Sequence, residues 1–576
     1  MTIRKVTPTE AEADTGTVTL PPAGLPSRNP TESYWLTDPS PALLGHRGTA
    51  DLPETADVVV VGSGITGAFA ARFLLLGEGG GGDGAAAVGG GGGGGGADAQ
   101  KGGVVMLEAR EACSGATGRN GGHCQPLVYG SVPAVAAFEL EVFEFMERFV
   151  KEEEVDCDWV SLAGVHAFLS KNMFELAAAE AEQLQKSHPE LAAQLEVVRP
   201  SDTSSLEKKQ TLASLRVPSA QGAIIQKKAA SLWPYKLVAS ILERLIADFP
   251  APAFNLQTNT PVTSLSRAET GPGWTLTTPR GKITARQVLL ATNGYTSHLL
   301  PAFSDLIVPV RGQIGALLVP PNPRTTTTTT TTTTTKLTHS YVFAADPDPA
   351  SDSPLAPRDD YLVQRPTTTL SSTSGGGEMI YGGGRRFARG LGVGEWRDDE
   401  LEAEVAGYLR GNLSPPLDLS SSSSSSPPLP VAAADQDQGG VLLEASFEWT
   451  GVMGYSRDHH AWVGPVPEEL GGGGAEGGLW VCAGYTGHGM PAAALSAREV
   501  VRQMMACGGG GGGKAAAMAA VVDEEGKGVR FPGEFVLSEE RVARARGLPH
   551  LTQGWEATNF ASLISGSGGP AGGKGM

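Results

Sequence analysis

The sequence has no cluster of lysines and arginines, no long apolar run and no pattern of paired cysteines. Its 576 residues carry a formal net charge of −18, and an acidic chain without a basic face is not expected to bind nucleic acid or an anionic membrane. No uninterrupted apolar stretch approaches the roughly 20 residues that a membrane-spanning helix needs. The five cysteines show no close pairing, which indicates reduced thiols inside a cell.

The two ends of the chain lack recognisable targeting signals. The first residues, MTIRKVTPTEAEADTG, are polar and contain no apolar core of a signal peptide. The last residues, GGKGM, do not form a peroxisomal tripeptide. We therefore expect a cytoplasmic protein.

Four low-complexity tracts interrupt the chain. They are a glycine-rich tract at 77–103, threonines at 325–335, serines at 420–426 and glycines at 508–513. Such tracts offer no apolar surface to bury, so we expect surface loops that leave the intervening motifs intact.

A glycine motif after a buried strand predicts a dinucleotide site. The strand is ADVVVV (56–61), a β-branched run that suits a parallel strand covered on both faces. The motif that follows it, GSGITG, consists of Gly62, Ser63, Gly64, Ile65, Thr66 and Gly67. Its glycines allow a tight turn, a close approach of backbone amides to a pyrophosphate, and close packing of the next helix.

A second strand, VVML (104–107), ends in Glu108, where a carboxylate can accept hydrogen bonds from a ribose diol. The spacing from Gly67 to Glu108 is 108 − 67 = 41 residues, whereas the motif places its acid about 20 residues on. The glycine-rich tract accounts for the excess if it forms a solvated loop.

A third glycine-rich segment, EACSGATGRNGGHCQP (111–126), indicates which dinucleotide is bound. A nicotinamide protein needs no second such loop, whereas a flavoprotein uses one along the pyrophosphate and under the isoalloxazine. The segment resembles the loop G-x-[ST]-G-R-N-G-G of the D-amino acid oxidase superfamily of FAD enzymes, in particular the glycine oxidase and γ-glutamylputrescine oxidase-like group.

The resemblance recurs in four later segments, in the family's order. These are KITARQVLLATNGYTSHLLP (282–301), PVRGQ (309–313), WTGVMGYSRDHHAWVGPV (449–466) and LWVCAGYTGHGM (479–490). The chain departs from the family at Ala461, where a proline is usual, and at His459 and His460, where smaller or apolar residues are usual.

The motif and the resemblance together imply a set of FAD-binding residues. Besides the six residues of GSGITG and Glu108, they are Ala109, Arg110, Ser114, Thr117, Asn120, Gly121, Gly122, Val262, Ala291, Thr292, Asn293, Gly484, Gly487, Gly489 and Met490. We interpret His123 and Cys124 as packed side chains, so the FAD is expected to be held non-covalently.

The resemblance also implies the fold class, which is α/β (α+β overall). We expect a Rossmann-like FAD-binding domain of the D-amino acid oxidase or glutathione reductase type, formed by residues 56–130, 216–305 and 470–506. A second, mixed-sheet substrate domain is expected from residues 131–215 and 306–469. Residues 1–55 are an N-terminal extension, and residues 514–576 a tail with one short helix.

Local patterns predict several elements. The apolar spacing in 132–151 and 234–249 favours amphipathic helices, and 176–194 is rich in Ala and Glu. DDYLVQRP (359–366) and EMIYGGGRR (378–386) are expected to be paired strands. In the tail, Ser538 is placed to cap a helix that ends before Gly547.

Candidate catalytic residues are His488, Arg119 and Asn120. His488 lies in GYTGHGM, where Gly487 and Gly489 are expected at the mouth of the last helix, able to stabilise negative charge on the flavin. A backbone-bonded histidine is the alternative. The resemblance places Arg119 and Asn120 beside the flavin, with bonds that staple the loop as the alternative.

Candidate substrate residues are Arg311, for a carboxylate, and Trp449, Met453 and Tyr455, which can line a pocket or belong to the core. Asp458, His459 and His460 do not predict a metal site, because adjacent side chains on a strand point oppositely.

These residues and the resemblance imply an enzyme, an FAD-dependent amine or amino-acid oxidase. Hydride transfer to the flavin would give an imine, water would hydrolyse it, and oxygen would be reduced to hydrogen peroxide. The partners expected are therefore a small amine or amino acid and molecular oxygen. One alternative is an amine dehydrogenase or demethylase with a protein or quinone acceptor, and another is a flavin-binding protein without catalysis.

Overall fold

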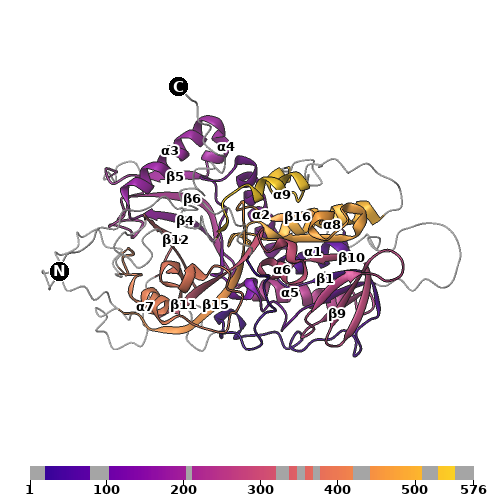
Figure 1. The fold of residues 1–576 in the computed structure, drawn as a ribbon. Helices are drawn as coiled ribbons and strands as arrows, with labels where there is room; N and C mark the ends of the chain where they lie inside the picture. Colours follow the sequence, from indigo (N-terminus) through magenta and orange to yellow (C-terminus); the bar gives the residue numbers. More distant parts are fainter. Residues whose placement is uncertain are drawn as a thin grey trace, which may run out of the picture.

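A computed structural model describes residues 20–77, 103–202, 210–318, 336–346, 357–366, 377–414, 416–419, 442–508 and 530–551. Within these residues, two β-sheets lie side by side, and helices cover their outer faces (Figure 1). The low-complexity tracts expected to be loops lie outside the described residues almost entirely. No described helix combines the length and apolarity needed to cross a bilayer.

The first sheet has eight strands among the described residues, with the central order β16-β17-β10-β1-β2-β7. Its strands are β1 (Thr55–Val61), β2 (Val104–Leu107), β7 (Phe254–Gln257), β8 (Ser264–Arg267), β9 (Trp274–Thr278), β10 (Gly281–Leu290), β16 (Trp462–Pro465) and β17 (Leu479–Ala483). β1 pairs in parallel with both β10 and β2. The two strands predicted around the glycine motif are therefore confirmed as neighbours at the centre of a parallel sheet.

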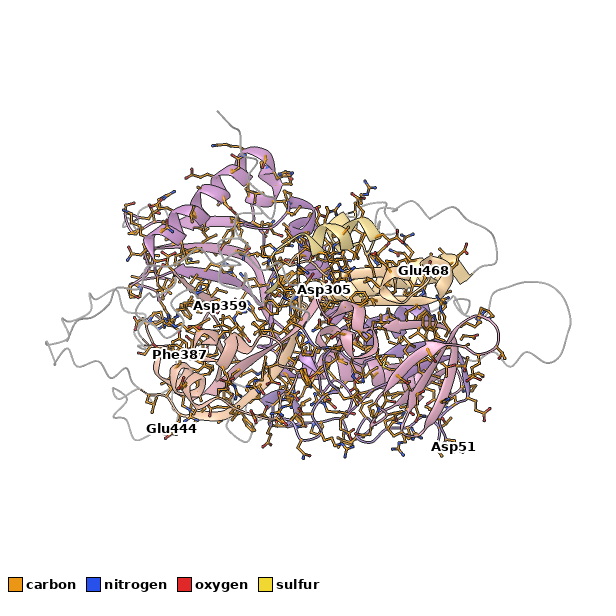
Figure 2. The ribbon with its side chains drawn as sticks, viewed as in Figure 1. Asp51, Asp305, Asp359, Phe387, Glu444 and Glu468 are labelled. Atoms are coloured by element: carbon orange, nitrogen blue, oxygen red, sulfur yellow. The ribbon has the colours of Figure 1, made fainter. Side chains whose placement is uncertain are left out.

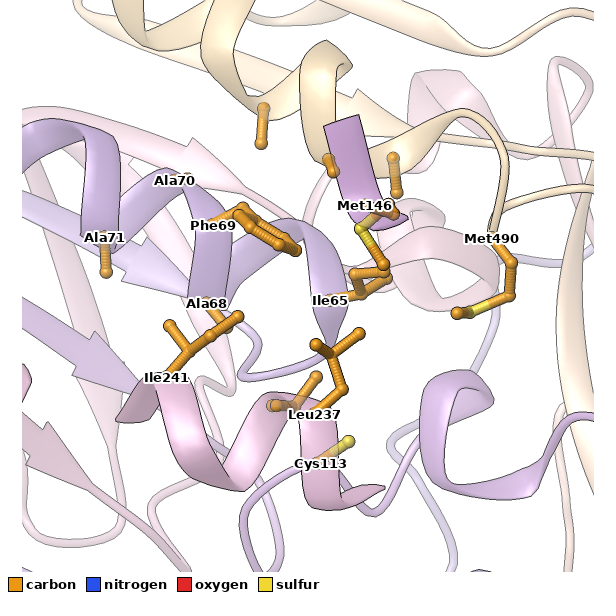
Figure 3. Packing of buried hydrophobic residues seen from close by; sticks show 14 of the residues in the cluster. Ile65, Ala68, Phe69, Ala70, Ala71, Cys113, Met146, Leu237, Ile241 and Met490 are labelled. Carbon is orange, nitrogen blue, oxygen red and sulfur yellow. The ribbon is translucent and has the colours of Figure 1, made fainter. Parts of the chain in front are cut away.

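Both faces of β1 are buried, as its uniform β-branched sequence predicts. Val58 and Val60 belong to the apolar cluster shared with the helices, whereas Val59 and Val61 belong to a cluster on the opposite face. The helices on the first face are α1 (Ile65–Leu76), α2 (Pro133–Glu152), α5 (Pro234–Asp248) and α8 (Ala493–Gly508). Figure 3 shows the small residues of α1, such as Ala68 and Ala71, which permit close packing in this layer.

The second sheet has nine strands among the described residues, with the main order β15-β11-β14-β13-β12-β4-β6-β3. Its strands are β3 (His123–Cys124), β4 (Val160–Phe168), β5 (Leu195–Val198), β6 (Gly222–Ser231), β11 (Ile307–Leu317), β12 (His339–Ala345), β13 (Arg358–Gln364), β14 (Met379–Gly383) and β15 (Ala445–Ser456). β13 and β14 pair in antiparallel fashion, which confirms the predicted strand pair. Among the described strands of this second sheet, only β12 and β4 pair in parallel, so the sheet is mixed.

The remaining helices are α3 (Lys171–Ser187), α4 (Pro189–Ala192), α6 (Thr296–Leu299), α7 (Ala403–Gly411) and α9 (Glu539–Arg546). α3 and α7 cover the second sheet. The helix expected at 176–194 begins earlier and is split, because Pro189 cannot continue the hydrogen bonding of α3 and starts α4 instead. α9 has the predicted cap, with the Ser538 hydroxyl accepting a hydrogen bond from the Arg541 amide.

Sheet membership differs from the expected domain boundaries at three strands. β3 and β6 were expected in the FAD-binding part but pair within the second sheet, whereas β16 was expected in the substrate part but pairs with β17 of the first sheet. Motif order along the chain does not report these pairings, because the hydrogen-bond partners are distant in sequence.

Candidate functional site

A cavity of about 1160 Å³ lies between the two sheets. Loops at the carboxyl ends of β1, β2, β10 and β17 line one side, and residues of β4, β6, β11, β13 and β15 line the other. In open parallel sheets, ligands bind in a crevice at the carboxyl ends of the strands. The cavity is therefore the candidate site.

The turn between β1 and α1 brings main chain to the cavity. Gly62 has a φ of 105°, and a Cβ there would lie 2.7 Å from the carbonyl oxygen of Ala291. A Cβ on Gly67 would lie 1.9 Å from the Gly62 oxygen, so both positions require glycine. Gly64 has no side chain with which to cap α1, and apart from the Ile65 amide, which donates to Thr117, the amides of the first turn are left to face the cavity. An anionic group such as a pyrophosphate fits this turn.

Glu108 lies at the end of β2, beside this turn. One of its carboxylate oxygens accepts hydrogen bonds from the Ser63 amide at 3.1 Å and the Ser63 hydroxyl at 2.7 Å. The other accepts from the Arg110 amide at 3.0 Å. A carboxylate has about four acceptor positions, so Glu108, which lines the cavity with 9% of its surface exposed, can accept a further bond from a ribose hydroxyl.

The loop that carries the third glycine-rich segment is tied to α1. The Thr117 hydroxyl accepts a hydrogen bond from the Ile65 amide at 3.1 Å. The Asn120 side-chain oxygen accepts from the Gly122 amide at 2.8 Å, and the Asn120 carbonyl accepts from the Trp35 indole at 2.5 Å. Asn120 therefore shapes a turn at the cavity wall.

Arg119 is buried and its guanidinium is already engaged. It donates to the carbonyl oxygens of Thr450 at 2.8 Å and Thr31 at 2.6 Å, and forms an ion pair with Asp398 at 3.2 Å. Arg110 forms a two-pronged pair with the same carboxylate, at 3.0 and 2.9 Å. These contacts fit the alternative in which Arg119 holds the loop in place, and not a role in which Arg119 contacts a reacting atom.

The C-terminal motif GYTGHGM lines the cavity beyond β17. Gly484 and Gly487 have φ values of 80° and 77°, a backbone conformation that favours glycine. The Asn293 side chain accepts a hydrogen bond from the Gly484 amide at 3.1 Å, and the Tyr485 and Thr66 hydroxyls lie 2.9 Å apart. The motif is thus joined to the turn after β10 and to the first turn of α1.

His488 forms an ion pair rather than a backbone hydrogen bond through its Nε2 atom. That atom lies 3.1 Å from a carboxylate oxygen of Glu139, which also accepts a bond from the Leu127 amide at 2.8 Å. Burial alone would lower the pKa of His488, but the Glu139 carboxylate raises it above its ordinary value. In contrast, burial together with the charge of His488 lowers the pKa of His123 to about 3, so His123 stays neutral.

The opposite wall of the cavity carries an arginine–carboxylate pair. Arg385 and Asp359 form an ion pair, and the Arg385 guanidinium also donates to the Tyr455 hydroxyl at 3.0 Å. Buried Asp360 fixes the adjacent turn by accepting a hydrogen bond from the Gly384 amide at 2.9 Å. Asp359 is labelled left of the centre of Figure 2. This wall thus offers one anionic group on β13 and one cationic group just after the neighbouring strand β14.

A neutral polar group lies on the same wall. The His166 Nδ1 atom hydrogen-bonds with the Tyr129 hydroxyl, and its Nε2 atom lies 2.9 and 3.1 Å from the amide nitrogens of Gln125 and Gln226. Burial, with the nearby histidine charges, lowers the pKa of His166 to about 3. This part of the wall can hydrogen-bond a ligand without adding charge.

The structure brings most of the predicted site residues to this one cavity. The predicted residues that line it are 62–66, 108–110, 117, 119–121, 262, 291–293, 453, 455 and 487–490. Gly67, Ser114, Gly122 and Gly484 are not among the lining residues and instead neighbour or support them.

Arg311 and Trp449 lie outside the large cavity. Arg311 is 4% exposed, and its guanidinium pairs with Glu402 at 2.7 Å. Trp449 is fully buried and donates to the Arg119 carbonyl at 3.0 Å. Arg311 therefore has a partner within the protein, and Trp449 belongs to the core.

Asp458, His459 and His460 do not converge. Asp458 accepts from the Arg541 guanidinium and from the main chain of His460. Across the described residues, no three His, Cys, Asp or Glu side chains are grouped as metal ligands would be.

Sequence reasoning missed several charged or polar residues of the site. They are Glu139, His166, Asp359, Arg385 and Asp398. Glu139 left one signal, because it follows Phe138 on the buried side of α2, where a carboxylate needs a partner. The others join the site through contacts between segments that are distant in the sequence, such as the pair of Asp398 with Arg110, which no local pattern reports.

Comparisons with known proteins agree with this geometry. Residues 57–503 match the family described as FAD dependent oxidoreductase, DAO. A glycine oxidase from Geobacillus kaustophilus has a similar structure, with 14% identity, a TM-score of 0.52, and coverage of 84% of this chain and 99% of its own. An L-amino acid deaminase from Proteus vulgaris that lacks its specific insertion sequence gives 13% identity, a TM-score of 0.49, and coverage of 86% and 96%. No curated protein matches the sequence.

Proposed function

The chain belongs to the DAO family of FAD-dependent oxidoreductases, and from this premise we propose that it oxidises the carbon–nitrogen bond of a small amine or amino acid. The products are an imine, which water hydrolyses to a carbonyl compound and ammonia or an amine, and hydrogen peroxide from oxygen. The observation that carries the proposal is the large cavity, which joins the glycine turn after β1 to a wall with paired charges on the second sheet.

The residues around the glycine turn fit the FAD. The turn at Gly62 and Gly64 would hold the pyrophosphate, and Glu108 would accept from the adenosine ribose. Bound FAD supplies the two-electron chemistry that amino-acid side chains lack.

His488 and Glu139 supply a held positive charge at the cavity. The Glu139 carboxylate accepts a hydrogen bond from the His488 Nε2–H and raises the pKa of His488, which favours the charged imidazolium. A fixed cation with a main chain rich in glycine stabilises negative charge that develops nearby. His488 is therefore our candidate for electrostatic stabilisation in the reaction.

Arg385 replaces Arg311 as the candidate for binding a substrate carboxylate. Its guanidinium is at the cavity wall, is oriented by Tyr455, and has Asp359 beside it. A planar guanidinium suits a carboxylate, and the neighbouring Asp359 carboxylate suits a substrate ammonium group. An amino acid or an amine with a distal charged group fits such a pair.

The test is oxygen uptake by the purified yellow protein across amines, N-methyl amino acids and D-amino acids. We expect at least one compound to give oxygen consumption with an equal amount of peroxide and a carbonyl product. Turnover only with a quinone or protein acceptor would replace the oxidase with a dehydrogenase. Bound FAD that none of the compounds reduces would contradict the proposed function and favour a flavin-binding protein without catalysis.

A further inference from the structure

Residues 530–551, the C-terminal segment, follow the part of the chain that matches the family, which ends at residue 503. The segment nevertheless contributes to the wall of the cavity, through Phe535, Leu548 and Pro549 among others. We infer that the C-terminal segment determines the size of substrate that the cavity accepts, and that Arg541 is the residue that positions it. The inference rests on the proposed function for the identity of the substrate, but not for the existence of the wall.

Arg541 of α9 is the strongest connection between the segment and the rest of the cavity wall. Its side chain is 2% exposed. It donates to both carboxylate oxygens of Asp458, at 2.7 and 2.9 Å, and to the carbonyl oxygens of His460 and Ala461, each at 2.8 Å. One guanidinium thus holds the whole loop 457–461, which connects β15 to β16.

The Arg541 guanidinium also stacks on the indole ring of Trp462, which holds it from another direction. The central carbon of the Arg541 guanidinium lies 3.7 Å from the centre of the buried Trp462 ring. Val536 forms a parallel bridge with Val463, and the Leu537 amide donates to the Val463 carbonyl at 2.9 Å. The residues that directly follow loop 457–461 therefore also have partners in the C-terminal segment.

Both ends of the segment are also anchored. Phe531 and Phe535 pack edge-on against Phe138 of α2, with ring centres 5.2 and 5.7 Å away. At the other end, Arg457 donates to the Leu548 carbonyl at 2.7 Å. Asp305, labelled near α9 in Figure 2, accepts from Arg546 at 3.1 Å. The segment is thus seated across the cavity from α2 to loop 457–461.

The seated segment makes this part of the wall largely apolar. Phe535 is buried and Leu548 half-buried, and Pro549 has no amide proton to offer. The charges of Arg541 and Asp458 neutralise each other, and burial lowers the pKa of His459 and His460, so both imidazoles stay neutral. Of the other charged residues of the segment that line the cavity, Arg544 pairs with Glu540, which leaves the carboxylate of Glu534. The wall therefore restricts a substrate mainly by its size.

Arg541→Met tests the positioning role, because it keeps a long apolar side chain over Trp462 but removes the bonds to Asp458 and the two carbonyls. The assay compares a bulky and a small amine that are both turned over. We expect kcat/KM for the bulky amine, divided by kcat/KM for the small amine, to rise about tenfold, the size of effect that a change in pocket fit produces. The change should come from KM of the bulky amine, with kcat for the small amine unchanged. Arg541→Lys should give an intermediate ratio.

Two further measurements keep the inference open to contradiction. Glu540→Gln, on the same helix with a side chain that is 83% exposed, is the control and should match the unmodified protein. Leu548→Ala trims the wall without touching Arg541, so it should raise the ratio even if Arg541→Met does not fold. The inference would be overturned by an unchanged ratio in Arg541→Met that is folded and loaded with FAD. If Arg541→Met does not fold, an unchanged ratio in Leu548→Ala would overturn it.

A readout without turnover separates this inference from the proposed function. Acrylamide, a neutral quencher, should quench the fluorescence of bound flavin about twofold more strongly in Arg541→Met, because the wall that limits access to the cavity is loosened. If no amine is oxidised but quenching rises, the proposed function is wrong, whereas the inference that the C-terminal segment limits access to the cavity is supported. Unchanged quenching with an unchanged substrate ratio would contradict that inference instead.

Discussion

Replacing Glu108 by alanine should release FAD. In the structure its carboxylate accepts three hydrogen bonds, from the amide and hydroxyl of Ser63 and the amide of Arg110. Alanine leaves the two amides without this acceptor, at a cost of about 1 kcal/mol each where cavity water can reach them. Loss of the bond from a ribose hydroxyl to a charged acceptor removes about 1.5–3 kcal/mol of binding free energy. FAD affinity should therefore fall about ten- to hundredfold.

Glu108→Gln should have a smaller effect than alanine. Its amide oxygen can still serve either Ser63 or Arg110, but its NH₂ group then faces the other donor. The assay is flavin absorbance per protein after purification, followed by thermal unfolding with added FAD. Glu269→Ala, an exposed glutamate between β8 and β9, is the matched control. Equal flavin content in all four proteins would refute the assignment of Glu108.

Three further changes test other parts of the cavity. Gly487→Ala puts a side chain at a φ of 77° and should lower the free energy of unfolding in urea by about 1–2 kcal/mol. Gly489→Ala should lower it less, because the nearest atom to the new Cβ would be 3.5 Å away. Equal urea midpoints for the two variants would contradict this expectation. Glu139→Gln leaves burial unopposed, so His488 should lose its proton at lower pH, seen as a downward shift of the pH midpoint of flavin reduction. Because the folded-state pKa of His488 is raised, the pair stabilises the protein fully below pH 6.5 and ceases to do so as pH rises through that pKa. Arg385→Met should raise KM for a substrate with a carboxylate about tenfold or more and leave that of a neutral amine unchanged; equal changes for both would argue against carboxylate binding.

The parts of the fold set by local pattern were predictable. β1 and β2 follow from uniform apolar runs, α5 from its spacing, and α9 from Ser538 before the helix and Gly547 after it. Each of these depends on residues within one element, which the sequence shows directly.

The partition of strands between the two sheets was not predictable in the same way. The sequence of β6 predicts a strand but not the sheet to which the strand belongs. Only its pairing with β4 places it in the second sheet. Pro189 was a visible signal for the break between α3 and α4, since proline ends a run of helical hydrogen bonds.

The cofactor side of the site was easier to predict than the substrate side. Glycines at a strand-to-helix turn have few alternative uses, and Gly62 and Gly67 lie where their lack of a Cβ is required. An arginine on a strand has many uses, so Arg311 was as reasonable a candidate as Arg385. Only the structure shows that Arg385 lines the large cavity, whereas Arg311 lies outside it and pairs with Glu402.

The two glycines expected at the mouth of the last helix differ in the structure. Gly489 lies before α8, which begins at Ala493, and has room for a side chain. Gly487 is the position in this motif where the backbone itself requires glycine.

The most direct test of the central claim is anaerobic reduction of the bound flavin by an amine carrying deuterium on the carbon next to nitrogen. Stopped-flow absorbance of the purified protein follows the loss of yellow colour for the normal and deuterated compounds. If that carbon–hydrogen bond is broken as the flavin is reduced, the deuterated amine should bleach the flavin several-fold more slowly, and Arg385→Met should weaken binding without removing the isotope effect. A flavin that stays oxidised with every amine and amino acid, while it is fully bound, would contradict the claim.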